Sequence, residues 1–422
     1  MGRAPKGSAR NPYKRHEAAA QAKKRGQSKA KRGKRCCSCC CPRFADLVLL
    51  AAIVYAYVPE GAFGVGPSFL NGHRPPQTMH AIVLTAAGAP EVQTDVPVPA
   101  VGRDELLIKV QAAPVNPSDV MHLAGLYDND SYPAPTGFEG AGVVVAAGEG
   151  VIGCTYGRLM LGQRVALATP KGGSWAQYAT VDALEAFPLP ADVGVDEGSA
   201  AIVNPMTVVG MLAQAHSDGA AAIVHTAAAS QLGQMLQRMS ASGRIGVPLI
   251  NVVRRDEQKE QLVALGAAAD DVLLSTSDDF EGALKSRLQH HVPAGGLAVA
   301  LDAVSGDSTG ALAAALPDHS KIYVYGALSG QAVQGVGPRD LFYRGISVHG
   351  FHLAKWLDSG VLDGLPRKLY AVARARALLA NELSTTFGSA VALSDAVEAM
   401  SDYRAHKQGK MTGQKLVIQP WA

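Results

Sequence analysis

Residues 221–235, AAIVHTAAASQLGQM, decide how the chain folds. A short apolar run, AAIVHT, leads into four small residues at 227–230 and then into a segment with helical spacing. A strand, a turn of small residues and a helix form the unit of a doubly wound parallel sheet, in which the backbone of the turn can approach a dinucleotide pyrophosphate. Gln231 stands where such a site commonly has a glycine. The turn alone therefore fits an ordinary strand-to-helix connection equally well.

The sequence around this unit repeats the same alternation of strand and helix. Further strands are predicted at 245–253, 271–274, 297–302 and 321–328. Helices are predicted near 197–215, 230–241, 256–265, 278–288 and 305–316. This alternation predicts a run of βα units joined by right-handed crossovers, and hence an α/β fold.

The residues before these units have a different pattern. Short β-rich runs, separated by Gly and Pro turns, occur at 80–88, 105–115, 140–150 and 163–169. Closely spaced strands of this kind indicate a barrel-like β region. The chain ends on another apolar strand, 415–420, which we expect to rejoin this first region.

Two arginines indicate the cofactor. Strand 245–253 leads into Arg254 and Arg255, where an NAD-dependent protein usually has an acid for the ribose 2′-hydroxyl. Guanidinium groups suit a 2′-phosphate instead, and therefore NADPH. Solvated arginines at the start of a helix are the alternative interpretation.

Charge and cysteine are unevenly distributed over the 422 residues. Residues 1–35 hold 13 of the 39 Lys and Arg and one acid, so they carry +12, while the remainder carries 26 basic and 35 acidic residues, or −9. An acidic body excludes a nucleic-acid-binding enzyme, which needs a basic face on the folded domain. Only one of the six cysteines, Cys154, lies beyond residue 41. The body therefore has no internal disulfide and no zinc site built on several thiolates.

Residues 1–78 have the layout of a targeting segment. The basic stretch precedes five cysteines between 36 and 41, an apolar run at 44–58 and a Gly- and Phe-rich segment. The apolar run is shorter than the ~20 residues that span a bilayer, so a cleaved signal and a retained anchor are both open. We expect an organelle reached through the endoplasmic reticulum, including a plastid, with a mitochondrion as the second choice.

The cysteine cluster has three interpretations. It is a low-complexity patch, or it is palmitoylated and contacts a membrane through residues 36–58, because cysteines beside apolar and polybasic segments supply two membrane signals. Metal binding is the third.

Six motifs together resemble a known family: AAPVNPSD (112–119), GFEGAG (137–142), GSWAQYA (173–179), VNPMTVVGML (203–212), TAAASQLG (226–233) and NVVRR (251–255). With them, residues 79–422 resemble the medium-chain dehydrogenase/reductase superfamily, in its zinc-free enoyl reductase and quinone reductase branches. VNPMT and NVVRR are most similar to mitochondrial-type trans-2-enoyl thioester reductases.

The resemblance implies a GroES-like β-rich catalytic domain at 79–203, completed by 345–422, and a Rossmann NADPH-binding domain at 204–344. Residues 1–78 precede them as a basic and hydrophobic leader or anchor. It also implies a homodimer formed at the edge of the Rossmann sheet near 321–328.

The resemblance also bears on metal binding. Zinc-dependent members of the superfamily have a Cys and a His where this chain has Asn116 and Phe138. Zinc-polarised alcohol oxidation is therefore not expected, and Glu139 is interpreted as structural. His349 and His352 lack a nearby third ligand, so no metal site is predicted there either.

The site residues that the resemblance implies are one proton donor and a set of cofactor contacts. Tyr127 matches the donor, although Tyr132 and the polar residues 128–130 leave open an aromatic that lines the cleft mouth. Asn204 and Thr207 match residues beside the nicotinamide. The pyrophosphate turn is Ala229, Ser230, Gln231 and Leu232, and Arg254 and Arg255 would bind the 2′-phosphate. Backbone walls for the carboxamide are Tyr325, Gly326, Ala327 and Leu328 with Phe351, His352, Leu353 and Ala354, and Lys415 matches a late phosphate-contacting lysine.

These residues predict an NADPH-dependent oxidoreductase. The reaction is the reduction of an activated carbon–carbon double bond, in a 2-enoyl thioester or an enone, by hydride transfer and protonation without zinc. The partner is a small-molecule substrate that enters a cleft between the domains. One alternative is an NADPH:quinone oxidoreductase, which needs no dedicated protein acid and tolerates the polar loop. The other is a catalytically idle, membrane-tethered NADPH-binding sensor.

Overall fold

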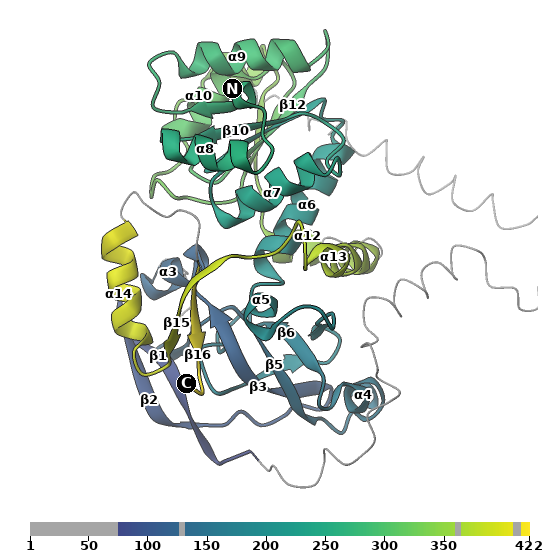
Figure 1. Ribbon diagram of the computed structural model, residues 1–422, viewed down its shortest axis with the longest axis vertical. Coiled ribbons are helices and arrows are strands. Elements are labelled where there is room, and N and C mark those ends of the chain that lie inside the picture. Colours follow the sequence, from purple (N-terminus) through teal and green to yellow (C-terminus); the bar gives the residue numbers. More distant parts are fainter. Residues whose placement is uncertain (1–74, 126–130, 359–363, 408–414) are drawn as a thin grey trace, which may run out of the picture. The chain divides into compact units, whose positions relative to one another are not determined.

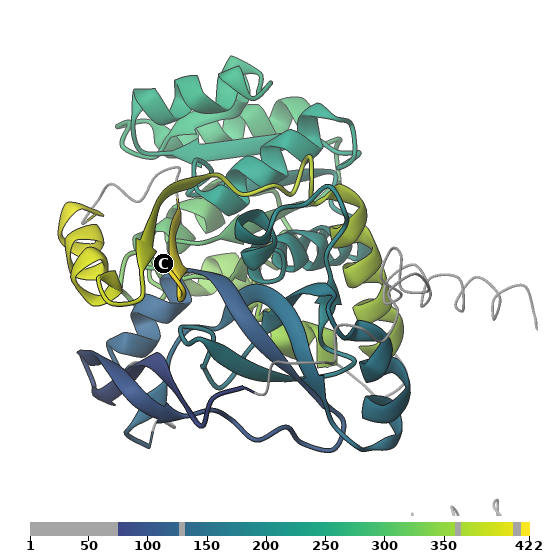
Figure 2. The ribbon, with the colours of Figure 1, turned by 60° about the horizontal axis from the view of Figure 1, so that its bottom comes forward.

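The computed structural model describes residues 75–125, 131–358, 364–407 and 415–422 (Figures 1 and 2). Within them the chain forms a six-stranded parallel sheet, a seven-stranded mixed sheet and a small three-stranded sheet. The α/β fold with a β-rich part and a doubly wound part, expected from the sequence, is confirmed.

The six strands of the parallel sheet follow the order β11-β10-β9-β12-β13-β14. Every neighbouring pair runs parallel. This is the Rossmann order, and it reverses between β9 and β12, where dinucleotides bind beyond the carboxyl ends of the strands. The strands are β9 (Ala222–Thr226), β10 (Leu249–Val253), β11 (Val272–Leu274), β12 (Ala298–Asp302), β13 (Lys321–Val324) and β14 (Ser347–Gly350).

Helices cover both faces of this sheet because successive side chains of each strand point to opposite sides. Val224 of β9 lies in one apolar core with α9 and α10, and its neighbour Ile223 lies in another with α6, α7 and α13. Figure 1 shows α8, α9 and α10 around the strands. The helices of this part are α6 (Val203–Ser217), α7 (Gln231–Ala241), α8 (Asp256–Ala264), η4 (Ala269–Asp271), α9 (Phe280–His291), α10 (Asp307–Ala315), α11 (Pro338–Phe342), α12 (Leu353–Asp358) and α13 (Gly364–Leu378).

The β-rich part is built around the long strand β3 (Glu105–Pro114). Its sheet has the order β15-β16-β3-β5-β6-β8, and β7 also pairs with β3. The other strands are β5 (Glu139–Ala147), β6 (Arg164–Ala168), β7 (Tyr178–Asp182), β8 (Phe187–Pro188), β15 (Phe387–Ala392) and β16 (Lys415–Gln419), beside the small sheet of β1 (Thr78–Ala86), β2 (Ala89–Pro97) and β4 (Ala134–Pro135). The short helices are α3 (Pro117–Leu123), η3 (Gly153–Gly157), α4 (Arg158–Met160), α5 (Val195–Ser199) and α14 (Ala396–Lys407).

The C-terminal strand rejoins the first region, as the sequence predicts. β16 pairs antiparallel with β3, Ile418 opposite Ala113, and Figure 2 shows the two strands side by side. The pairing is closed by the indole N–H of Trp421, which donates to the carbonyl of Val110 at 2.7 Å. The ammonium of Lys109 lies 4.0 Å above the same ring.

β14 bears on the end of the nucleotide-binding region at residue 344, which stays a prediction. β14, at 347–350, pairs parallel with β13 and is the sixth strand of the parallel sheet. It is short and half exposed, so no continuous apolar run marks it in the sequence. The predicted dimer contact at 321–328 is affected too, because β13 is an interior strand and the sheet edge is β14. The homodimer itself stays a prediction.

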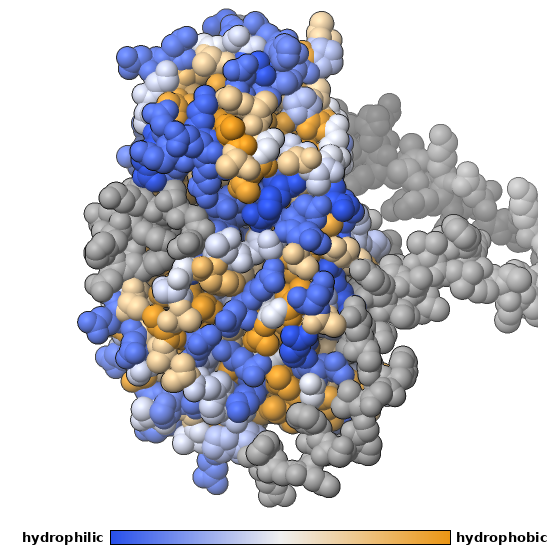
Figure 3. Space-filling model, viewed as in Figure 1, coloured by the Kyte–Doolittle hydropathy of each residue, from blue (hydrophilic) through white to orange (hydrophobic). Residues whose placement is uncertain are grey.

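The face drawn in Figure 3 is largely hydrophilic, with apolar patches scattered among polar residues. Of the helices in the described ranges, none combines the length and apolar character needed to cross a bilayer. The predicted leader, with its cysteine cluster and the apolar run at 44–58, lies outside the described residues.

Candidate active site

Asp302 fixes the carboxyl ends of β9 and β12, where the strand order reverses. Its carboxylate is fully buried and accepts hydrogen bonds from the hydroxyls of Thr226 at 2.9 Å and Thr309 at 2.7 Å. The Thr226 hydroxyl in turn accepts from the N–H of Ala303 at 2.8 Å. These bonds link the ends of β9 and β12 to each other and to the start of α10, at the floor of the expected cofactor crevice.

The turn from β9 to α7 has the close packing that a dinucleotide site requires. Ser230 is the N-cap of α7, and its hydroxyl accepts from the N–H of Gly233 at 3.2 Å. A Cβ on Gly233 would overlap the carbonyl of Ala228, so the helix starts directly against the turn only because residue 233 is a glycine. The predicted pyrophosphate residues 229–232 all lie in this turn and the first turn of α7. Their contact with a cofactor stays a prediction.

Gln231, the departure from the usual glycine, has a structural role. Its side chain is buried, and its amide oxygen accepts from the N–H of Thr386 at 2.9 Å. Seven residues further along α7, the guanidinium of Arg238 donates to the carbonyls of Glu382 and Ser384. The segment between α13 and β15 is therefore hydrogen-bonded to the first turn of α7 through Gln231 and to the last turn of α7 through Arg238.

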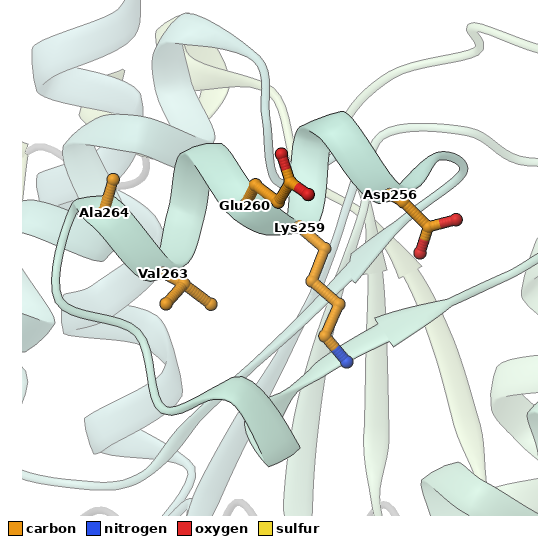
Figure 4. A pocket seen from close by; sticks show the side chains of 5 residues that line it. All are labelled: Asp256, Lys259, Glu260, Val263 and Ala264. Atoms are coloured by element: carbon orange, nitrogen blue, oxygen red, sulfur yellow. The ribbon is translucent and has the colours of Figure 1, made fainter.

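Arg254 and Arg255 lie at the carboxyl end of β10, as predicted. The N–H of Arg254 donates to the side chain of Gln258 at 3.0 Å, and the Arg255 guanidinium lies 3.9 Å from the carboxylate of Glu257. A hollow follows on α8 (Figure 4), where the Lys259 side chain points away from the carboxylate of Glu260. It is lined by Asp256, Lys259, Glu260, Val263 and Ala264, none of which is a predicted contact.

Tyr325 is held by a residue that the sequence analysis missed, His225. The Tyr325 hydroxyl and the Nε2 atom of His225 are 2.7 Å apart, and the two rings stack at 13°. Burial lowers the pKa of His225 to about 3, so its ring is neutral. Burial also raises the pKa of Tyr325. A histidine inside an otherwise apolar strand was the available signal.

The two predicted backbone walls follow β13 and β14. The N–H groups of Tyr325 and Leu328 donate to the carbonyls of Asp302 and Ala303, which holds residues 325–328 against the end of β12. Phe351 is buried, its N–H donates to the carbonyl of Val324, and Leu353 is half-buried. His352 and Ala354 are exposed. The structure therefore brings the two walls to adjacent strand ends.

A buried polar cluster joins the β-rich part to the start of α6. Glu139 accepts from the amide of Asn116 at 2.9 Å, and the ammonium of Lys415 donates to the Asn116 oxygen at 2.5 Å and to Glu139 at 3.5 Å. The second oxygen of Glu139 accepts from the N–H groups of Ile202 and Val203. All of these side chains but Val203 are buried. In the structure the ammonium of Lys415 is bound within this cluster. The phosphate contact of Lys415 stays a prediction.

Asp119 completes the cluster from α3. Its two oxygens accept from the N–H groups of Asn116 at 2.8 Å and Phe138 at 3.0 Å. Burial raises the pKa of Asp119 to about 7, and the nearby charge of Glu139 adds to the rise. The carboxyl group therefore changes its charge near neutral pH.

Other predicted residues are placed as follows. Asn204 is half-buried in the first turn of α6 and Thr207 is buried one turn later. Tyr127 and residues 128–130 lie outside the described residues, and Tyr132 is partly exposed. His349 stacks on Tyr323. In the described ranges no group of three or more His, Cys, Asp or Glu side chains is arranged to hold a metal.

Known proteins resemble this arrangement in both parts. Residues 102–191 match the Alcohol dehydrogenase GroES-like domain. The mitochondrial enoyl-[acyl-carrier-protein] reductase of Bos taurus is 30% identical over 261 residues, which are 61% of this chain and 67% of that protein. A putative NADPH:quinone reductase from Mesorhizobium loti has a structure that superposes with a TM-score of 0.70 at 31% identity, over 82% of this chain and 100% of that one. The chain belongs to the medium-chain dehydrogenase/reductase superfamily.

Within the superfamily the chain falls in the zinc-free enoyl reductase and quinone reductase branch. The structure of a mycobacterial relative in complex with NADPH superposes with a TM-score of 0.67 at 25% identity. The match covers 81% of this chain and 100% of that one. This medium-chain reductase is therefore an oxidoreductase that uses a nicotinamide nucleotide.

Gly233→Ala tests the turn before α7. The added methyl group has to displace the backbone of Ala228, and overpacking of this kind typically costs about 1–3 kcal/mol of unfolding free energy. We expect the Kd of NADPH, measured by fluorescence titration, to rise at least tenfold, or about 1.4 kcal/mol. Gly194→Ala is the matched control, since nothing lies within 4 Å of its added Cβ. Equal affinities in the two variants would refute the role of the turn.

Asp119 gives a pH dependence of stability. The pKa of Asp119 is raised in the folded chain. Between about pH 4 and pH 7 its carboxyl group is therefore protonated in the folded chain but ionised in the unfolded chain. Unfolding releases a proton in this range, so rising pH favours the unfolded chain. Relative to Asp119→Asn, the unfolding free energy of the wild type should fall by up to about 1.4 kcal/mol per pH unit in this range. Urea denaturation at several pH values measures the difference. A difference that stays constant or rises with pH contradicts the assignment.

Proposed function

We propose that this medium-chain reductase catalyses the NADPH-dependent reduction of an activated carbon–carbon double bond, in a 2-enoyl thioester or an enone, without zinc. The observation that carries the proposal is the cluster of Asn116, Glu139 and Lys415. Asn116 stands where zinc-dependent members have a ligand, and here it binds the ammonium of Lys415. An amide, an ammonium and one carboxylate are not a zinc ligand set. The enoyl reductase relative supports the same reaction class.

NADPH fits the residues around the parallel sheet. Gly233 lets the start of α7 pack directly against the carbonyl of Ala228, which a Cβ would overlap, so the first N–H groups of the helix lie at the end of β9, where a pyrophosphate would bind. Arg254 and Arg255 at the end of β10 supply positive charge for a 2′-phosphate, and the two walls after β13 and β14 offer backbone groups to a carboxamide. When bound, NADPH supplies the hydride; the chain orients the nicotinamide and excludes water from it.

The Arg254→Ala, Arg255→Ala double variant tests the choice of cofactor. Each charge-assisted bond to a phosphate is worth about 1.5–3 kcal/mol, so the KM for NADPH should rise roughly 100-fold or more while the KM for NADH changes less than about threefold. Arg158→Ala removes an exposed arginine from α4 and serves as the control. Equal loss with both nucleotides would show that the arginines do not select the 2′-phosphate.

The proton for the α-carbon is assigned to Tyr127. Tyr127→Phe should lower kcat by roughly 10²–10⁴, the contribution of a general acid, and leave the Kd of NADPH nearly unchanged. The matched variant is Tyr132→Phe, on a partly exposed tyrosine five residues later in the sequence. Unaltered turnover in Tyr127→Phe would rule out the assignment.

A quinone reductase is the second candidate function. The relative from Mesorhizobium loti, which this chain covers completely, carries that description. The deciding experiment follows NADPH oxidation by the full chain with a trans-2-enoyl thioester, an enone and a short quinone in parallel. Faster turnover of the thioester or enone supports the main proposal, and turnover of the quinone alone replaces it. The relatives are reductases, which gives no support to an idle sensor.

For the cellular compartment we propose the mitochondrion. The relative from Bos taurus is described as mitochondrial, which favours the second of the two sequence expectations. The comparisons give no support to a plastid or to a route through the endoplasmic reticulum.

A further inference from the structure

The start of α6 is capped by a residue from another part of the fold. The N-cap position of α6 is Ile202, whose side chain has no polar atom and makes no capping hydrogen bond. The carboxylate of Glu139, the first residue of β5, takes this role and accepts from the N–H groups of Val203 at 2.8 Å and Ile202 at 3.3 Å. N–H groups in the first turn of a helix have no partner within it, and a negative charge there is stabilising.

The other oxygen of Glu139 is bound to two further segments. It accepts from the Asn116 amide at 2.9 Å, at the N-cap of α3, and lies 3.5 Å from the ammonium of Lys415, at the start of β16. One side chain with no exposed surface therefore joins β5 to the starts of α3, α6 and β16.

The partners of Glu139 explain why a carboxylate is needed. All four groups that bind it are donors: two backbone N–H groups, an amide NH₂ and an ammonium. A carboxylate only accepts, so both of its oxygens are satisfied. An amide of the same shape would place its own NH₂ against one of these donors, which leaves a buried pair unsatisfied.

The capped helix carries two predicted cofactor contacts. Asn204 directly follows Val203, and Thr207 lies one turn later. A shift of α6 relative to β5 and α3 would therefore move these two side chains relative to Asn116 and Lys415. Hydride transfer is sensitive to such shifts, because a misplacement of ~1 Å can cost about 100-fold in rate.

We infer that Glu139 is a positioning residue for hydride transfer, which sets the start of α6 against the buried cluster of Asn116 and Lys415. The inference rests on the proposed function for its kinetic consequence, and on the four hydrogen bonds for its structural one. Glu139 does not touch the substrate; it acts through α6.

Glu139→Gln in the full chain is the test. We expect kcat to fall about 10- to 100-fold, with a larger primary isotope effect from deuterated NADPH, because the hydride step itself is slowed. The Kd of NADPH should change less than about threefold, since the predicted contacts to its phosphates lie at the start of α7 and after β10 and not on α6. Hydrogen exchange of the peptide that contains Ile202 and Val203 should become faster. Glu139→Asp keeps the charge and should recover part of kcat.

The matched control is Glu185→Gln, on an exposed carboxylate that pairs with Lys368 at 3.0 Å. It should leave kcat, affinity and exchange as in the wild type. The inference is overturned if Glu139→Gln keeps the wild-type kcat, if its α6 exchange is unchanged, or if kcat, NADPH affinity and melting temperature fall together, as a purely structural residue would cause. A wild type that binds NADPH but reduces none of the substrates overturns the proposed function, and the exchange measurement then decides the role of Glu139 by itself.

Discussion

The carboxylate of Glu139, enclosed by four donors, is the interaction on which the rest of this reductase depends. Taking a charge out of water is costly, and the cost is offset only because every lone-pair direction finds a donor. The same contact is where the β-rich part and the start of α6 meet. An apolar residue in place of Glu139 would leave the first N–H groups of α6 without an acceptor. The buried carboxylate therefore fixes where α6 starts relative to β5.

Two hydrogen-bonded groups of buried side chains, one in the parallel sheet and one in the β-rich part, fix the elements on either side of α6. In the parallel sheet, Asp302 and the hydroxyls of Thr226 and Thr309 fix neighbouring strand ends through short hydrogen bonds. In the β-rich part, Asn116, Asp119 and Lys415 are fixed by one another. The proposed reaction requires that both stay in register, because the proposal places the nicotinamide on the parallel sheet and the reacting double bond on the β-rich part.

The elements of the parallel sheet were predictable because each rests on local pattern. β9, α7, β10 and the closing β16 read directly from apolar runs and small-residue turns, and the arginines after β10 were found by position. The contact between Lys415 and Asn116 could not be predicted, because the two residues are 299 positions apart in the sequence and only the folded chain brings them together. His225 and Tyr325, 100 residues apart, were missed as a pair for the same reason. The pairing of β14 with β13 was not evident from a local pattern, because β14 is short and partly exposed.

The pairing of β16 with β3 bears on how the protein is made. β3 is synthesised before the whole parallel sheet, whereas its partner β16 is synthesised after it. The parallel sheet, whose strands are consecutive in the chain, can assemble during synthesis, while the β-rich part has to wait with its core incomplete. Until β16 has been synthesised, Glu139 lacks the ammonium of Lys415. A chain that stops between β14 and β16 would therefore keep every strand of the parallel sheet but leave the end of β3 and the carboxylate of Glu139 without these partners.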